Sequence, residues 1–265
     1  MATTTVAETS TFTVGGVASA TFGSIGRNFL TFAILALLAA APQQAMAWYS
    51  TALNLSSPAL AANPAALAPY FAMLGASVLV SVIMTYVLQA TIVYGTVTDL
   101  SGRRASLGSS LGTAFKLILP LIGLSIVSGV GVMLGLILLI VPGIILALGW
   151  SIAVPVRVVE RVGVFASLSR SWELTSGYKG TIFLLVLVFA LASWLFSALG
   201  LAFAGVFSFA QLTKPTAFPI AFYVYSGVIQ AIQSLVGAAG AATIYYQLRA
   251  MKEGIAPEQL AAVFD

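Results

Sequence analysis

The side chains that could do chemistry in this 265-residue chain are few, and they gather where long apolar stretches end. The densest group lies between residues 157 and 179, and it contains Arg157, Glu160, Arg161, Arg170, Glu173 and Lys179. Arginine and lysine at such a position bind anionic lipid headgroups, at about 1 kcal/mol per residue near the surface. Glu160 stands between two arginines, and we expect it to be a charge partner. Catalysis would need a second converging acid or base.

The composition excludes most classes of catalytic site. The chain has no histidine and no cysteine, which removes Ser–His and Cys–His nucleophiles, zinc sites, haem and iron–sulfur clusters. The apolar runs contain no carboxylate either, and proton-driven carriers usually keep one inside the membrane. We therefore expect no enzyme activity, no cofactor, no metal and no nucleic-acid partner.

The charges lie at the borders of four charge-free windows. These windows run between Arg27 and Asp99, Lys116 and Arg157, Lys179 and Lys214, and Lys214 and Arg249. Charged residues make up 7% of the chain and apolar residues 60%, whereas roughly a quarter of a soluble domain is charged. The chain is therefore predicted to be an all-α, polytopic membrane protein.

Six segments are long and apolar enough to cross about 30 Å of hydrocarbon. They are predicted at 28–49, 71–97, 117–141, 143–156, 181–208 and 219–248, with Pro142-Gly143 dividing the third from the fourth. The fourth is the shortest and contains Pro155, so we expect it to be kinked or broken. A second interpretation of the first segment is a signal peptide ending at Ala45-Met46-Ala47, although 26 preceding residues make an unusually long leader.

The basic residues orient this arrangement. Every lysine and arginine except Lys214 falls on one side of a six-helix chain, and the positive-inside bias makes that side cytoplasmic. The prediction is three outward hairpins with both termini in the cytoplasm. Residues 1–26 form a cytoplasmic tail with an interfacial segment, 27–248 the transmembrane domain, and 249–265 a cytoplasmic tail. Aromatic residues are expected at the boundaries, with Trp172, Tyr178, Tyr245 and Tyr246 on the inner one.

Three similar segments precede the outward-going helices, beginning near Ala18, Ala105 and Ala166. In the second, Leu107, Leu111 and Phe115 recur every four residues, and in the third Val164, Leu168 and Trp172 do so. This spacing predicts short amphipathic helices in the headgroup plane. Either the chain repeats one unit three times, or these are the ordinary amphipathic loops of a multispan protein. The Thr/Ser-rich segment before Thr13 is predicted to be disordered unless a partner orders it.

Weakly polar residues line one face of three of the predicted helices. The candidate intramembrane face contains Ser81, Thr85, Gln89, Gln230, Gln233 and Ser234. Such residues allow close packing and interhelical hydrogen bonds; the alternative is that Gln89, Gln230 and Gln233 line a polar cavity. Gly131 and Gly135 form a GxxxG pattern, which is typical of a helix-dimer seam.

The candidate contacts for anionic lipid or a partner lie on the cytoplasmic side. They are Arg103, Arg104, Arg157, Arg161, Arg170, Trp172, Lys179 and Arg249. These charges could equally serve only to set topology.

Two stretches carry a family resemblance. They are Arg170-Ser171-Trp172-Glu173-Leu174-Thr175-Ser176-Gly177 and Tyr245-Tyr246-Gln247-Leu248-Arg249 followed by Lys252-Glu253-Gly254. With Val141-Pro142-Gly143-Ile144 and Pro155–Glu160, they resemble the membrane domain of glycerophosphoryl diester phosphodiesterases and the related YciC-like proteins. The resemblance implies a six-helix protein of the bacterial inner membrane. The catalytic barrel of that family is absent, so no hydrolase activity is implied.

Two functions follow from these patterns. The first is a non-catalytic accessory or scaffold subunit that binds membrane lipids and a protein partner or a second copy of itself. The alternative is a transporter or handler of lipids or apolar small molecules, acting through the second, fifth and sixth predicted helices.

Overall fold

The computed structural model describes residues 12–52, 68–102, 107–210 and 220–254. All regular structure in these ranges is helical. Within them, six segments are long and apolar enough to cross a membrane. This confirms the all-α class and the number of apolar segments that the charge-free windows predict.

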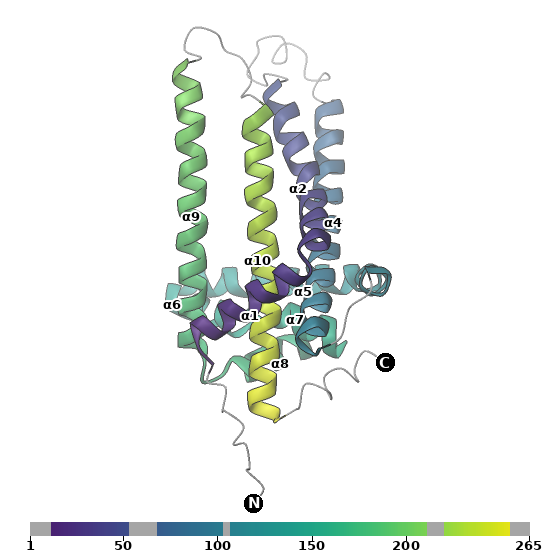
Figure 1. Ribbon diagram of the computed structural model, residues 1–265, viewed down its shortest axis with the longest axis vertical. Helices are drawn as coiled ribbons and strands as arrows, with labels where there is room; N and C mark the ends of the chain where they lie inside the picture. Colours follow the sequence, from purple (N-terminus) through teal and green to yellow (C-terminus); the bar gives the residue numbers. More distant parts are fainter. Residues whose placement is uncertain (1–11, 53–67, 103–106, 211–219, 255–265) are drawn as a thin grey trace, which may run out of the picture.

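Helices α2 (Phe29–Ala52), α4 (Ala68–Leu100), α9 (Lys179–Ala210) and α10 (Ile220–Glu253) run along the long axis of the molecule (Figure 1). Helix α10 is the central one and packs against both α2 and α4. Its small residues allow this close approach, since Ala231, Ala238, Ala239 and Ala242 are all buried. These alanines lie beside the predicted polar face of this segment, whose Gln230 and Ser234 are not buried.

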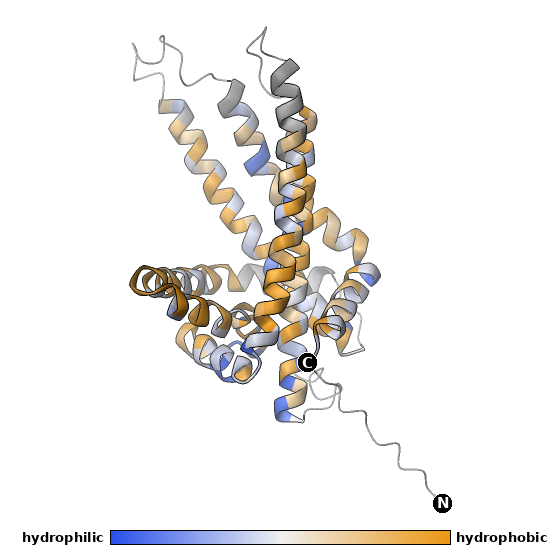
Figure 2. Ribbon diagram, turned by 90° about the vertical axis from the view of Figure 1, so that its left-hand side faces the viewer, coloured by the Kyte–Doolittle hydropathy of each residue, from blue (hydrophilic) through white to orange (hydrophobic). Residues whose placement is uncertain are grey.

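Helices α5 (Leu107–Leu138) and α6 (Ile140–Gly149) form a hairpin that lies across the long axis. Figure 2 shows the hairpin projecting from the side of the bundle, with a strongly hydrophobic surface. The chain turns at Leu139, three residues before the predicted break. Pro142 falls in the first turn of α6, where its missing N–H is tolerated.

The GxxxG pattern of Gly131 and Gly135 lies where the two helices of this hairpin contact each other. A Cβ added at Gly131 would come 2.6 Å from the Trp150 ring, and one at Gly135 would come 3.0 Å from Cα of Gly143. Both glycines therefore let α6 approach α5 within one chain. The sequence pattern predicted a close contact between helices of two chains, and the structure has that close contact between two helices of the same chain.

The fourth predicted segment is broken, as expected. Residues 150–152 interrupt it, and α7 (Ala153–Glu160) follows α6 after them. The break precedes Pro155, which occupies the first turn of α7 and therefore costs that helix no hydrogen bond. The carbonyl groups at the end of α6 must then find partners outside their own helix.

Two of the three predicted amphipathic helices are present, α1 (Val14–Arg27) and α8 (Val164–Thr175). Thr13 caps α1 by accepting a hydrogen bond from the N–H of Gly16 at 3.2 Å. The second expected segment is not separate, because α5 continues without interruption from Leu107. The side chains of Leu107, Leu111 and Phe115 lie outside the described set, as does the tail before Phe12.

Arg27 at the end of α1 forms a two-pronged ion pair with Asp99 at the end of α4, with a shortest N–O distance of 2.6 Å. The hydrogen bond to Asp99 raises the pKa of Arg27 above its ordinary value. The pair ties α1 to the end of the bundle where α8 also lies (Figure 1).

Candidate functional site

Four charged residues from three helices meet at the end of α10, and we call them the carboxylate–arginine cluster. They are Glu160 of α7, Arg170 of α8, and Arg249 and Glu253 of α10. Arg170 Nε lies 3.4 Å from Glu160 Oε2, and Arg249 Nε lies 2.9 Å from Glu253 Oε2. Arg170 also contacts Glu253. Two arginines thus face two carboxylates, which leaves the cluster electrically balanced.

Tyr245, one helical turn before Arg249 on α10, completes this cluster. Its hydroxyl donates to Glu160 at 3.0 Å and accepts from Arg249 at 2.8 Å. The ring is fully buried, at 0% exposure, so the prediction that Tyr245 belongs to an aromatic boundary layer is wrong. The residue is a core residue, because the interhelical contacts of α10 extend past the apolar stretch to this turn.

The sequence identifies Glu160 correctly as a charge partner, yet its partners are distant in the chain. They are Arg170 and Arg249, at 3.4 and 4.0 Å, rather than the adjacent arginines. Glu253 was not predicted as part of a site. The sequence feature that could have identified it is the four-residue spacing of Tyr245, Arg249 and Glu253, which places all three on one helical face.

The conspicuous Arg170–Gly177 stretch holds the broken end of α6. The Ser171 hydroxyl donates to the carbonyl of Gly149 at 2.8 Å, and the Thr175 hydroxyl lies 3.2 Å from the same oxygen and 2.9 Å from the carbonyl of Ser171. The Trp172 ring covers Gly149, where an added Cβ would overlap the indole. The Lys179 ammonium lies 3.2 Å from the centroid of that ring. This stretch therefore supplies the partners that the end of α6 lacks.

Several predicted lipid contacts are thus occupied by the protein itself. Arg170, Trp172, Lys179 and Arg249 lie around the junction of α6, α8 and α10 and contact other protein groups. Arg157 donates to the carbonyl of Val162. Arg161 is exposed and has a left-handed backbone, with φ of 53°. Arg103 and Arg104 lie outside the described residues.

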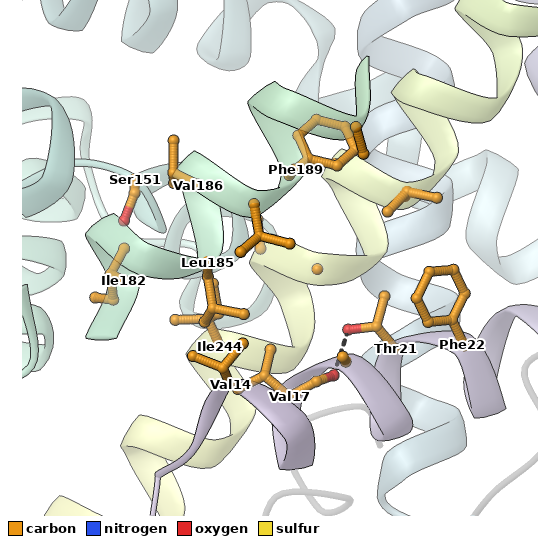
Figure 3. Close-up of a pocket in the computed structure, with 17 residues that line it drawn as sticks. Val14, Val17, Thr21, Phe22, Ser151, Ile182, Leu185, Val186, Phe189 and Ile244 are labelled. Atoms are coloured by element: carbon orange, nitrogen blue, oxygen red, sulfur yellow. Dashed lines mark hydrogen bonds between the residues drawn. The ribbon is translucent and has the colours of Figure 1, made fainter. Parts of the chain in front are cut away.

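An apolar pocket lies between α1, α9 and α10, and we call it the α1–α9–α10 pocket (Figure 3). Its volume is about 340 Å³. The side chains of Val17, Leu185 and Phe189 form two of its walls. On the third wall, from α10, Gly237 and Gly240 leave room beside Ile244. The lining has two hydroxyls, those of Thr21 and Ser151, and Thr21 already donates to Val17 O at 2.7 Å. The space is suited to a hydrocarbon chain.

A second pocket, of about 380 Å³, lies between α2 and α4. Ser81 and Thr85 of the predicted polar face line it, with Ser77 and with Gln43 of α2. The three glutamines proposed for a polar cavity, Gln89, Gln230 and Gln233, are not among its lining residues. The polar face is thus divided between a pocket and a helix contact.

Gln230 makes that helix contact. It accepts a hydrogen bond from Gln44 at 2.9 Å and donates to Gln43. Since both partners are on α2, the three amides join α10 to α2 in the half of the bundle remote from the carboxylate–arginine cluster (Figure 1). Polar residues here bind helices together, as the packing interpretation predicted.

No family model, no curated protein and no solved structure matches this chain. Within the described residues, no group of three or more His, Cys, Asp or Glu side chains could hold a metal ion.

Proposed function

We propose that this protein is a non-catalytic, multi-pass membrane protein that binds the hydrocarbon chain of a membrane lipid, or of a comparable apolar molecule, in the α1–α9–α10 pocket. The pocket itself is the observation that supports this function. Its volume of about 340 Å³ falls in the range typical of small-molecule sites. This proposal develops the lipid-handling alternative, because a binding space lies between two of the helices that it names.

The position of the pocket supports a lipid chain as its occupant. Its α9 residues, Ile182 to Ala192, follow directly after Lys179, where the charge-free stretch begins. Its α10 residues, Val236 to Ile244, end just before Tyr245. The pocket thus lies in the membrane half nearest the basic residues, and α1 forms its rim. A chain entering sideways from that leaflet would reach it without leaving hydrocarbon.

The carboxylate–arginine cluster supports a role other than headgroup binding. Its two arginines are matched by two carboxylates, so little positive charge is left to attract a phosphate. We infer that the cluster joins α7, α8 and α10 and thereby fixes the position of α8, from which the chain continues into α9.

The orientation and location are part of the proposal. The side that carries α1, α8 and the end of α10 is cytoplasmic, because the basic residues gather there. The bacterial inner membrane is the membrane that the Arg170–Gly177 and Tyr245–Gly254 resemblance implies.

Filling the pocket tests the function. Gly240→Leu places a side chain in the pocket, where a Cβ meets nothing within 4 Å. The purified protein is reconstituted in vesicles with a trace of phospholipid that carries a diazirine on its acyl chain. Photolysis should crosslink this lipid to peptides of α1, α9 and α10, in a manner that unlabelled lipid saturates. The variant should lose that labelling.

Gly75→Leu on α4 is the matched control. Gly75 is exposed, lies outside the pocket and, like Gly240, has nothing within 4 Å of an added Cβ. It should keep the labelling. Equal labelling of all lipid-facing helices, unchanged in Gly240→Leu, would rule out a specific chain site.

A second candidate is the accessory subunit, and the surface of α9 favours it. Large side chains are exposed along most of this helix, including Leu191, Trp194 and Leu195, and only 6% of its apolar window is buried. A membrane helix with so little packing offers a surface to a partner chain. Purification in mild detergent should then retain a stoichiometric partner that Trp194→Ala weakens, whereas recovery of the monomer alone would contradict this candidate.

A further inference from the structure

The hairpin of α5 and α6 has unequal arms. Helix α6 has 10 residues, which reach only about 15 Å. A crossing of the hydrocarbon needs roughly 30 Å. Residues 140–160 are long and apolar enough to cross a membrane only if α6 and α7 are counted as one helix. The turn at 150–152 separates these two helices. Helix α6 by itself cannot return a chain from the far side of a bilayer.

The turn of this hairpin is unsuited to water. From Gly129 to Gly149 the sequence has no polar side chain. Leu138, Leu139, Ile140 and Val141 at the turn are 65–78% exposed. The turns that connect crossing helices lie at the aqueous surface, where polar and aromatic residues are usual. This one would put four large aliphatic side chains there.

The backbone of the turn is suited to hydrocarbon. Leu139 N donates to Gly135 O at 3.0 Å, and Gly143 N donates to Leu139 O at 3.3 Å. Leu139 is the one residue of extended backbone between the two helices, and its N–H and its carbonyl are therefore both paired. A turn inside a membrane must meet this condition, because an unpaired backbone group in hydrocarbon costs several kcal/mol.

The direction of the hairpin agrees with these two features. Helices α5 and α6 run across the axis of α2, α4, α9 and α10, at the level of the lower half of the bundle (Figures 1 and 2). That half is the one that carries α1 and α8.

We propose that the α5–α6 hairpin lies within the cytoplasmic leaflet and returns to the side from which it enters, with lipid chains of that leaflet covering its turn. The assignment of the leaflet rests on the orientation proposed above. Four helices then cross the membrane, α2, α4, α9 and α10. Because the hairpin adds either two crossings or none, both termini stay on the same side in either case. The hairpin makes the protein wider in one leaflet than in the other.

Cysteine labelling tests this placement directly, since the natural chain has no cysteine. Single variants Leu139→Cys, Ala68→Cys and Gly163→Cys are treated with a membrane-impermeant maleimide, on intact cells and on inverted vesicles. Ala68 begins α4 at the proposed outer end, and Gly163 is an exposed residue beside α8 with free space around its Cα. Ala68→Cys should react only from outside and Gly163→Cys only from inside.

Leu139→Cys should react from neither side in the membrane and should react fully after denaturation. A bimane on this cysteine should be quenched most by phospholipids brominated on their acyl chains, rather than by a water-soluble quencher. Ile137→Cys and Val141→Cys repeat the measurement if Leu139→Cys does not fold. Labelling of Leu139→Cys from outside at the rate of Ala68→Cys would overturn the proposal.

Two further results separate the possible errors. Disulfide-linked dimers of Leu139→Cys formed in membranes would make a second copy, and not lipid, the neighbour of the turn, and would also overturn the proposal. Labelling of Ala68→Cys from inside would overturn the leaflet assignment and the proposed orientation together. The lipid-chain function is unaffected by any of these results, since its readout is the crosslink in the α1–α9–α10 pocket.

Discussion

The indole of Trp172, on α8, lies directly on the backbone of Gly149 at the end of α6. The contact needs a glycine, because a Cβ at this position would overlap the ring. The Ser171 hydroxyl donates to the carbonyl of the same glycine, and the Thr175 hydroxyl is within reach of it at 3.2 Å. One turn of α8 thus supports the point where the fourth apolar segment breaks.

Gly149→Ala should destabilise the protein. The added methyl must displace the indole ring, and overpacking of this kind costs about 1–3 kcal/mol. The free energy of unfolding can be measured by titration with sodium dodecyl sulfate in mixed micelles, followed by circular dichroism. Gly163→Ala is the control, since its Cβ meets nothing within 4 Å, and it should leave the midpoint nearly unchanged. Equal stability of the two variants would contradict the contact.

Removing both hydroxyls that bind Gly149 should cost more than the sum of the single changes. Ser171→Ala or Thr175→Val leaves one donor to the carbonyl, and each should cost about 1 kcal/mol. The double variant leaves a buried carbonyl without either donor, a loss of about 3 kcal/mol. Thr175→Ser keeps the hydroxyl and should retain most of the stability. The same unfolding titration gives all four values, and strict additivity would mean that the carbonyl finds another partner.

Glu160→Gln should destabilise the junction of α7, α8 and α10, whereas Glu173→Gln should not. Glu160 is 14% exposed, faces two arginines and accepts a hydrogen bond from Tyr245. Weakening a hydrogen bond to a charged group costs about 2 kcal/mol. Glu173 is 69% exposed and forms a local pair with Arg170, which is worth less than about 0.5 kcal/mol. Thermal unfolding in detergent at low and high salt compares them. A larger loss for Glu173→Gln would refute the assignment of the cluster.

The amide contact of Gln44 with Gln230 should contribute a small, measurable coupling. Polar contacts between membrane helices are worth about 0.6 kcal/mol on average. A double-mutant cycle of Gln44→Leu and Gln230→Leu should give this value, because the two side chains are 2.9 Å apart. Gln233→Leu with Gln44→Leu is the comparison cycle. A zero coupling for the first pair would mean that the contact of Gln44 with Gln230 does not help to hold α2 against α10.

Local patterns predicted most of the helices. A charge-free window predicts the extent of a membrane helix, since each charged residue marks where hydrocarbon must end. Accordingly, α2, α4, α9 and α10 begin and end close to the predicted residues. The break in the fourth segment was also predicted. Its position was not, because a proline near the start of a helix is harmless there and the turn falls before Pro155.

The sequence predicted which charged residues belong to the candidate site, and the tertiary structure decided which of them pair with one another. The sequence singled out Glu160, Arg170 and Arg249 as charges at a membrane border, where lipid headgroups are the expected partners. Folding brings residues up to 89 positions apart together, with 249 − 160 = 89, so that these charges neutralise one another. No single-chain pattern encodes such a pairing, since it depends on how α7, α8 and α10 cross.

The sequence by itself determined that the chain is helical, that six of its segments are apolar enough for a membrane, and where its charges gather. Those properties are local, because solvation acts on each segment separately. Only the tertiary structure decided that α6 turns back against α5, that Tyr245 is buried, and that a pocket remains between α1, α9 and α10. These features depend on the fit of side chains from distant segments. The need for glycine at position 149, for example, follows only from the position of the Trp172 ring over it.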